Sequence, residues 1–104
     1  MDRRSSQRII TGYKVELLSG DNSHTGIIEN LSASGVNVLT DPLDAEIEFL
    51  PNESIELKFK AHTGKAVILK CTIMWSSKIP PDNVRHRIGM KLLEMPWDKF
   101  DYFL

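Results

Sequence analysis

The sequence predicts an all-β fold, a small antiparallel barrel of six strands that is closed or nearly closed. Two patterns favour this fold: short segments alternate apolar with polar residues, and runs rich in Gly, Pro, Asn, Asp and Ser separate them. The length is the third observation, since 104 residues that are 41% hydrophobic suit one domain with one core. We therefore expect a single domain with any ligand site on its surface.

Three strands are expected in the first forty residues. The alternation begins at Tyr13 and continues to Leu17, as a half-buried strand requires. The turn-forming run SGDNS at 19–23 then predicts a hairpin whose return strand covers about 24–30. After the Ser-rich run LSASG, the third strand begins at Gly35 with the sequence GVNVLT.

Three further strands are expected in the second half. Apolar and charged residues alternate over 55–61, and the run HTG at 62–64 predicts a turn into the strand 66–75. These two strands are expected to be the longest and to pair as a hairpin. Within the second, Cys71 follows the apolar alternation and is expected to be a small core residue. The segment 86–94 predicts the sixth strand.

The connection 41–56 differs in composition from the strands around it. It contains six carboxylates and no Lys or Arg, and Pro42 and Pro51 make it a poor interior strand. We expect mainly a solvated connection, with a short strand or helical turn near 47–50.

The predicted organisation is a flexible basic arm at 1–12, a barrel at 13–95 and a short terminal helix at 96–104. Polar and basic residues without strand or helix periodicity indicate the arm. In the tail, Pro96 suits a helix start and the apolar residues follow at helical spacing.

Charge and cysteine content exclude several classes of protein. Thirteen Lys and Arg against fourteen Asp and Glu give a net charge of -1, so no overall basic field attracts nucleic acid. No apolar run of about 18 residues predicts a membrane span, and no secretory signal is apparent. The lone Cys71 cannot form an internal disulfide. We expect a cytoplasmic protein.

Two motifs carry the candidate chemistry. The first is an RxxxR formed by Arg4 and Arg8, with Arg3 directly before it. The second has the form [D/N]xSxxG and consists of Asn30, Ser32 and Gly35. The first predicted hairpin runs away from the arginines and returns to the second motif. The two motifs are therefore expected to meet in space.

This pair of motifs, in this order and spacing, resembles the PilZ domain family of bacterial receptors for the second messenger cyclic di-GMP. The WSS run at 75–77 and the run HRIGMKLLEM at 86–95 resemble the closing half of a PilZ barrel. The resemblance implies a six-stranded PilZ-type barrel with a short C-terminal helix and a mobile N-terminal arm. The ligand-binding residues that it implies are Arg3, Arg4, Arg8, Asn30, Ser32 and Gly35.

The chemistry of these residue types agrees with such a ligand. Guanine presents O6 and N7 as adjacent acceptors, which match the planar fork of Arg4 or Arg8 better than a lysine would. Asn30 can accept hydrogen bonds from the Watson–Crick edge of guanine, and the Ser32 hydroxyl can donate to a phosphate. Gly35 would allow a backbone conformation, or a ligand approach, that a Cβ would block.

We expect a non-enzymatic receptor or adaptor that orders its arginine arm over cyclic di-GMP and signals to a protein partner. Arg3 supplies extra charge that an intercalated pair of ligands would need. The alternative is a PilZ-like adaptor that binds proteins without nucleotide. A barrel for single-stranded nucleic acid is disfavoured by the acidic balance. Hydrolysis is disfavoured because no cluster of carboxylates and histidines at metal-ligand spacing accompanies the arginines, and no cofactor or metal is expected.

Several other polar and aromatic residues are weaker candidates for the site. The three histidines, His24, His62 and His86, lack metal-ligand spacing and are expected on the surface or in turns. Trp75 and Trp97 are interpreted as packing residues more readily than as stacking platforms. Arg85 and Arg87 are either surface charges or face the ligand from the far side.

Overall fold

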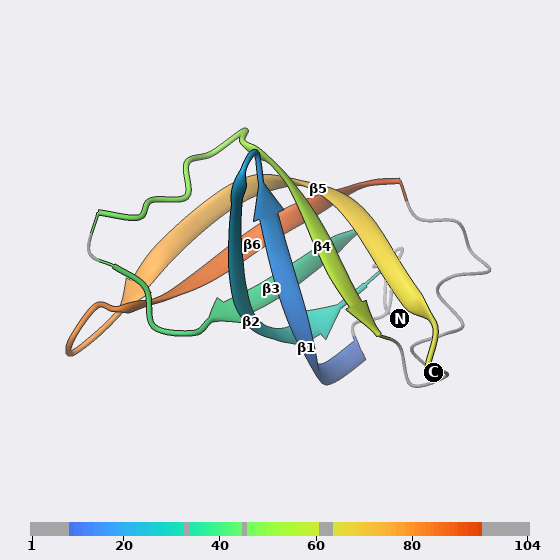
Figure 1. Cartoon of the computed structure of the whole chain (residues 1–104), viewed down its shortest axis with the longest axis horizontal. Helices are drawn as coiled ribbons and strands as arrows, with labels where there is room; N and C mark the ends of the chain where they lie inside the picture. Colours follow the sequence, from blue (N-terminus) through green and yellow to red (C-terminus); the bar gives the residue numbers. More distant parts are fainter. Residues whose placement is uncertain (1–8, 33, 45, 61–63, 95–104) are drawn as a thin grey trace, which may run out of the picture.

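Six antiparallel strands form a closed barrel in the computed structural model, which describes residues 9–32, 34–44, 46–60 and 64–94. The order around the barrel is β1-β2-β3-β6-β5-β4 (Figure 1). Strands that are consecutive in sequence pair with each other, except β3 and β4. The barrel is completed by the pairing of β3 with β6 and of β1 with β4. The strands are β1 (Ile9–Ser19), β2 (Asn22–Leu31), β3 (Gly35–Thr40), β4 (Ser54–Lys60), β5 (Ala66–Ile79) and β6 (Arg85–Glu94).

Alternate residues of each strand fill the interior of the barrel. In β4, for example, Ile55, Leu57 and Phe59 are buried and the residues between them are exposed. Cys71 is fully buried in β5 and belongs to this core, as predicted. Burial raises the pKa of its thiol to about 12. The all-β barrel and its six strands are therefore confirmed. The prediction that β4 is one of the two longest strands is wrong, because β4 has 7 residues, whereas β1 has 11 and β2 and β6 have 10 each.

Bulges explain where the strands extend beyond the alternating patterns. β1 begins at Ile9, so residues 9–12 lie in the barrel rather than in the arm. A shift in register between Ile10 and Tyr13, next to the positive φ of 74° at Gly12, interrupts the alternation there. β5 continues to Ile79 after a second bulge, which hides its last residues from a search for strict alternation.

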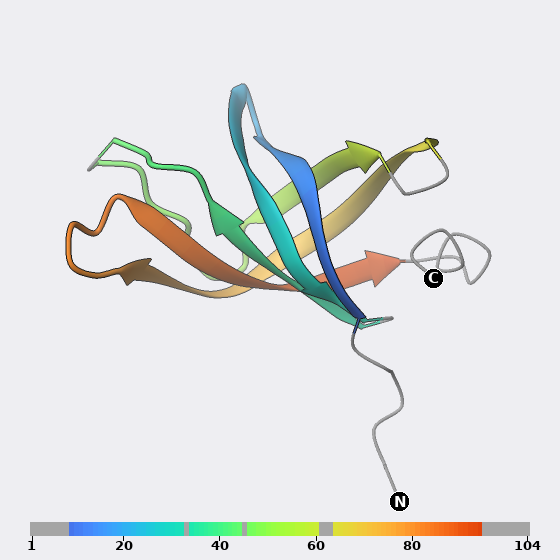
Figure 2. The ribbon, with the colours of Figure 1, turned by 90° about the horizontal axis from the view of Figure 1, so that it is seen from below.

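The connection between β3 and β4 contains neither a strand nor a helix among its described residues. It is largely exposed, as predicted, but Phe49 is only 5% exposed and joins the core. The Leu43 amide donates to the Val84 carbonyl at 2.7 Å, which holds the connection beside the β5–β6 hairpin. Figures 1 and 2 show these two segments at the same end of the barrel.

The predicted helix at 96–104 and residues 1–8 of the predicted arm lie outside the described residues. Within the described ranges, no helix is long and apolar enough to cross a membrane.

His86 corrects the prediction that the histidines lie on the surface or in turns. It occupies an inward-facing position of β6 and is 3% exposed. Its ring meets Phe49 edge-on with 5.2 Å between the centroids, and its amide donates to the Thr40 hydroxyl. Burial lowers the pKa of the imidazole, and the charge of Lys78 lowers it further.

The lowered pKa of His86 predicts loss of stability on acidification. The unfolded chain binds a proton near pH 6.5, whereas the folded chain binds it only at lower pH. This contribution to stability is fully present above about pH 6.5 and declines as the pH falls through the lowered value. Urea unfolding between pH 7.5 and 5 measures it, and His86→Phe should flatten the dependence. An equally steep dependence in this variant would assign the effect to other groups.

Candidate functional site

The [D/N]xSxxG motif, residues 30–35, includes the end of β2, the connection to β3 and the first residue of β3, and we call it the motif turn. Hydrogen bonds of Ser32 stabilise it. The Ser32 amide donates to the Gly35 carbonyl at 2.9 Å. In return, the Ser32 hydroxyl accepts from the Gly35 amide at 3.2 Å and from the Ser34 amide at 3.4 Å. Ser32 is 6% exposed. Its hydroxyl oxygen therefore fixes the shape of the turn from within.

Among the described residues of the turn, the acceptors for the proton of the same hydroxyl are distant. The Gly35 carbonyl oxygen and the Ser34 hydroxyl oxygen both lie 3.4 Å from the Ser32 hydroxyl oxygen, which is beyond the usual range of about 2.5 to 3.0 Å for O–H donors. A closer phosphate oxygen would be a better acceptor. The role of Ser32 as a phosphate donor remains a prediction.

Gly35 allows two strands to approach closely. A Cβ at this position would lie 3.1 Å from the Met90 carbonyl oxygen of β6. Next to it, the Leu92 amide donates to the Ser34 carbonyl at 3.1 Å, which ties the motif turn to β6. Gly35 does not have a positive φ, so close approach is the reason for a glycine here, rather than an unusual backbone conformation.

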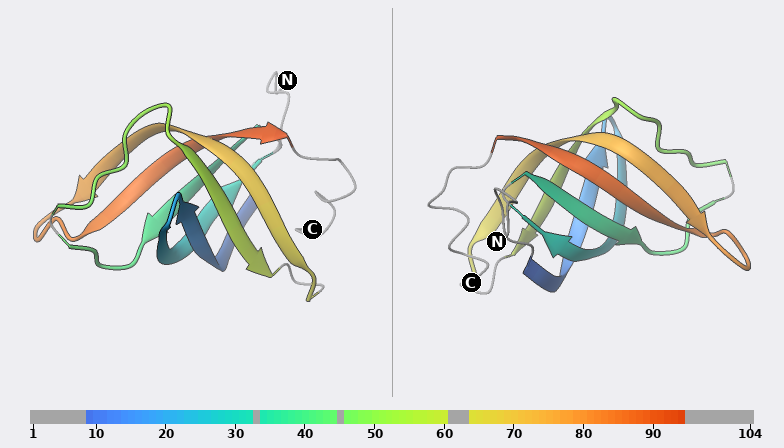
Figure 3. Two further views of the ribbon diagram at one scale, coloured as in Figure 1. Left: turned by 45° about the horizontal axis from the view of Figure 1, so that its top comes forward. Right: turned by 180° about the vertical axis from the view of Figure 1, so that it is seen from behind.

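The start of β1 lies beside the motif turn. Ile9 pairs with Leu31 and Ile10 with Asn30, so the described chain begins next to the second motif (Figure 3). The arginines Arg3, Arg4 and Arg8 lie outside the described residues. The last of them immediately precedes Ile9 in sequence. The register of β1 and β2 thus places the first described residues beside the second motif, and the meeting of the two motifs stays a prediction.

Four residues on the outside of the barrel form a line across neighbouring strands, which we call the outer row. Asn30 of β2 pairs with Asn37 of β3, Asn37 pairs with Gly89 of β6, and Gly89 pairs with Trp75 of β5. Neighbouring strands are about 4.8 Å apart, so the row extends roughly 14 Å from the motif turn. It places the polar side chains of Asn30 and Asn37 and the indole of Trp75 along one line on the outside of the barrel.

Trp75 lies flat on the sheet rather than in the core. A Cβ on Gly89 would overlap the indole nitrogen and the adjoining ring carbons, so the indole covers this glycine directly. Trp75 is nevertheless 44% exposed to solvent. The sequence predicts that Trp75 is mainly a packing residue. The structure gives it a packing face against Gly89 and a second face towards solvent.

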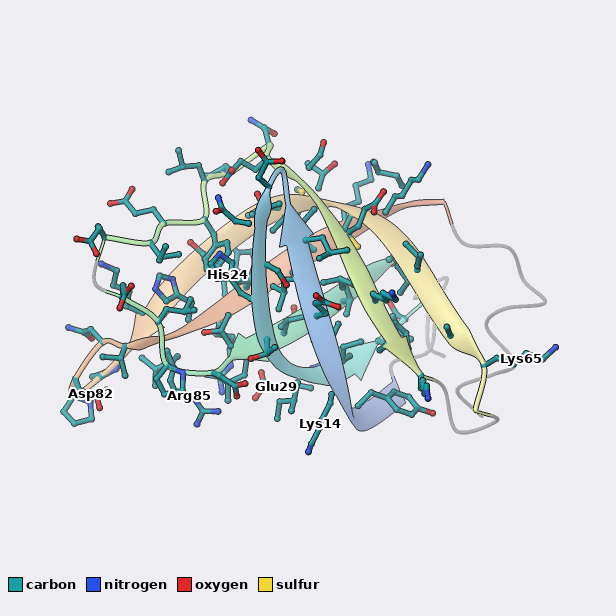
Figure 4. The ribbon with its side chains drawn as sticks, viewed as in Figure 1. Lys14, His24, Glu29, Lys65, Asp82 and Arg85 are labelled. Atoms are coloured by element: carbon teal, nitrogen blue, oxygen red, sulfur yellow. The ribbon has the colours of Figure 1, made fainter. Side chains whose placement is uncertain are left out.

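Two arginines of β6 lie beside the outer row and have partners. Arg87 donates to both oxygens of Glu29 at 2.8 and 3.0 Å, and this hydrogen bonding lowers the pKa of the Glu29 carboxyl against the opposing effect of desolvation. The charge of Arg85 lowers it further, and Figure 4 shows Arg85 and Glu29 on the same edge of the barrel. The Arg85 guanidinium donates to the Thr40 carbonyl at 2.9 Å. Both arginines therefore have structural partners.

The described residues contain no group of three or more His, Cys, Asp or Glu side chains that could hold a metal ion. The groups assembled at the motif turn and outer row are hydrogen-bond donors, acceptors and an aromatic face. Such a surface can bind a polar aromatic ligand.

The family model described as PilZ domain matches residues 2–99 of the chain. A solved structure of the Bacillus subtilis inhibitor of motility (MotI/DgrA) has a TM-score of 0.75 at 16% identity; it covers 100% of this chain and 49% of its own. The chain thus spans about half the length of that protein.

Two further solved structures share the fold. The PilZ domain of YcgR from Escherichia coli, solved with c-di-GMP, has a TM-score of 0.71 at 15% identity, covering 97% of this chain and 86% of that one. The PilZ domain of CeSA from a cellulose-synthesizing bacterium has a TM-score of 0.64 at 18% identity, covering 93% and 90%. No curated protein matches the sequence.

Proposed function

The chain belongs to the PilZ domain family, and we propose that it is a non-enzymatic, bacterial cyclic di-GMP receptor that signals to a protein partner. The observation that carries the proposal is the register of β1 against β2. It pairs Ile9, the residue after Arg8, with Leu31, the residue before Ser32, and this supports a site to which both motifs contribute. The complex of the E. coli YcgR PilZ domain with c-di-GMP supports the choice of ligand.

In the proposed mechanism, the arginines of residues 1–8 close over a ligand that rests on the motif turn. The hydrogen bonds between Ser32 and Gly35 stabilise the ends of this turn, which lowers the cost of reorganisation on binding. Closure of the arm changes the surface that the barrel presents to a partner. The binding energy of the ligand thereby biases which surface is available.

Calorimetric titration of the full chain with cyclic di-GMP tests the proposal. We expect saturable heat in the micromolar range or below, and no hydrolysis of the recovered nucleotide. A silent titration at high micromolar concentrations would favour the alternative, a PilZ-like adaptor that binds proteins without nucleotide.

Asn30 and Ser32 are expected to contribute differently to this binding. If Asn30 accepts hydrogen bonds from the guanine edge, Asn30→Ala should reduce the ratio of the affinity for cyclic di-GMP to the affinity for cyclic di-AMP. Ser32→Ala should lower the affinity for both nucleotides by the same factor, because the variant lacks the hydroxyl that donates to phosphate and that stabilises the turn. Titrating both nucleotides into both variants separates the roles. Equal loss of discrimination in the two variants would contradict this assignment.

Arg3 is expected to set the number of bound ligands. Residues 1–14 carry four cationic side chains and one carboxylate, although the chain as a whole has a net charge of -1. An intercalated pair of cyclic di-GMP molecules carries four phosphate charges, so it needs more positive charge than a single ligand. We expect two ligands per protomer, and about one for Arg3→Leu, by calorimetry at matched salt. A wild-type ratio of one, or an unchanged ratio in the variant, refutes this role.

A further inference from the structure

A shallow groove on the outside of the barrel lies between residues 48–51 and β5. Exposed apolar side chains line it: Leu50 and Met74 are each 54% exposed, and Trp75 is 44% exposed. Phe49 lies beneath them as part of the core. Isolated exposed apolar residues are common on proteins, but three around one hollow are typical of an interaction surface.

A bulge in β5 creates one wall of the groove. Ile73 pairs with Met90 and Trp75 pairs with Gly89, so Met74 is an extra residue without a cross-strand position. The usual alternation between inside and outside is interrupted here. Met74 and Trp75 are consequently both exposed although they are consecutive in the strand.

Hydrogen bonds hold the opposite wall in place. The Asn52 amide donates to the Ile73 carbonyl at 2.8 Å, and the Ile73 amide donates to the Glu53 carbonyl at 2.9 Å. The Ser76 hydroxyl donates to the Phe49 carbonyl at 2.8 Å. Because these bonds fix the connection against the bulged strand, the groove is preformed and binding needs little ordering of the protein.

The surroundings of the groove are acidic. Glu48 lines it, and Asp44 and Glu46 are exposed on the same connection, in the 41–56 segment that contains no Lys or Arg. Among the described residues, these three carboxylates form no salt bridge. Lys78 lines the groove from β5 and supplies one opposing charge. A cationic partner is therefore favoured by charge complementarity.

We propose that this groove docks a basic amphipathic segment of a protein partner. Apolar side chains of the segment lie against Leu50, Met74 and Trp75, and its Lys or Arg side chains face the carboxylates of 44–48. The inference rests on the proposed function, since the partner of a receptor is what receives its signal. Trp75 belongs to both the outer row and the groove, so a ligand on the outer row adjoins the docking surface.

The direct test is a titration of the full chain with a short synthetic peptide of leucine and lysine at helical spacing, followed by amide chemical shifts in NMR. A peptide with glutamate in place of each lysine is the control. We expect the basic peptide to shift the amide signals of residues 46–50, 52 and 73–76, and the acidic peptide to leave them unchanged at the same concentration. No shift of these amides by the basic peptide at millimolar concentration overturns the proposal.

Two sets of variants separate the apolar and the charged contributions. Leu50→Ser with Met74→Ser should weaken the basic peptide at least tenfold, because both side chains are exposed and their loss leaves the core intact. The triple variant Asp44→Asn, Glu46→Gln, Glu48→Gln should weaken it about tenfold at low salt. The matched control removes three carboxylates elsewhere, with Glu16→Gln, Asp21→Asn and Asp82→Asn. Equal affinities of the two triple variants would show that only overall charge matters, which contradicts the proposal.

The titration is made first without nucleotide, so its result is independent of cyclic di-GMP binding. Absence of nucleotide binding by calorimetry refutes the proposed receptor function and leaves the docking result standing. Shifts of the groove amides on simple dilution of the protein would identify a second copy of the chain as the occupant, and would overturn the assignment to a basic partner.

Discussion

Arg4→Ala and Arg8→Ala are each expected to abolish or severely weaken cyclic di-GMP binding while the melting temperature stays nearly unchanged. Each arginine offers a planar fork to a guanine edge or a phosphate, and loss of one charge-assisted contact costs about 1.5 to 3 kcal/mol. This corresponds to roughly a ten- to hundred-and-fiftyfold loss of affinity, and to more where the arm fails to close. Stability should persist because both arginines precede β1, whose first residue is Ile9.

Calorimetry with each variant, alongside thermal unfolding, measures both quantities. Lys58→Ala, which removes one exposed cation from β4, is the matched control and should bind normally. Arg4→Lys should not restore affinity, because an ammonium group cannot make the bidentate contact. A large fall in melting temperature for either arginine variant would show a structural role and would contradict this reading of the motif.

The barrel could be predicted from sequence wherever strands alternate strictly. The pattern of β4 and the first part of β5 is regular, and the hairpin between them was predicted with nearly the observed bounds. Alternation fails at bulges, because one extra residue reverses which face the following side chains occupy. For this reason the local sequence pattern could not predict the extension of β1 to Ile9 or the outward position of Met74 beside Trp75.

Burial in an irregular segment was also beyond sequence reasoning. Phe49 lies among carboxylates and prolines, and no periodicity marks it as a core residue. Its burial depends on the contacts of its ring with His86 and His24, which come from distant strands. The same contacts explain why His86, predicted near the surface, is buried in β6.

One part of the candidate site could be predicted from local sequence, and the other part could not. The motif turn is local, so Asn30, Ser32 and Gly35 could be predicted to act together. The outer row depends on the register of four strands, and register is a property of the whole sheet. Asn37 is placed next to Asn30 by the pairing of the consecutive strands β2 and β3, whereas Trp75 joins the outer row only through the pairings of β3 with β6 and of β6 with β5.

Gly89→Ala is expected to lower the free energy of unfolding by about 1 to 3 kcal/mol, as overpacking does. The indole of Trp75 occupies the space that the new methyl group needs, and an indole ring cannot yield like the end of a flexible side chain. The ring must leave the sheet, which exposes both its faces to water. Urea unfolding measures the loss, and tryptophan emission in a Trp97→Phe background, which should move to longer wavelength, reports the displacement.

A double-mutant cycle identifies the cause of the loss. Trp75→Leu removes the bulk that the Gly89→Ala methyl group meets, so the second substitution should cost much less in that background. Displacement of the indole would also remove the aromatic face from the outer row. We therefore expect both Gly89→Ala and Trp75→Leu to lower the affinity for cyclic di-GMP. If the two substitutions are additive in stability, the indole does not rest on Gly89. If affinity for the nucleotide is unchanged in both variants, the outer row beyond Asn37 does not contact the ligand.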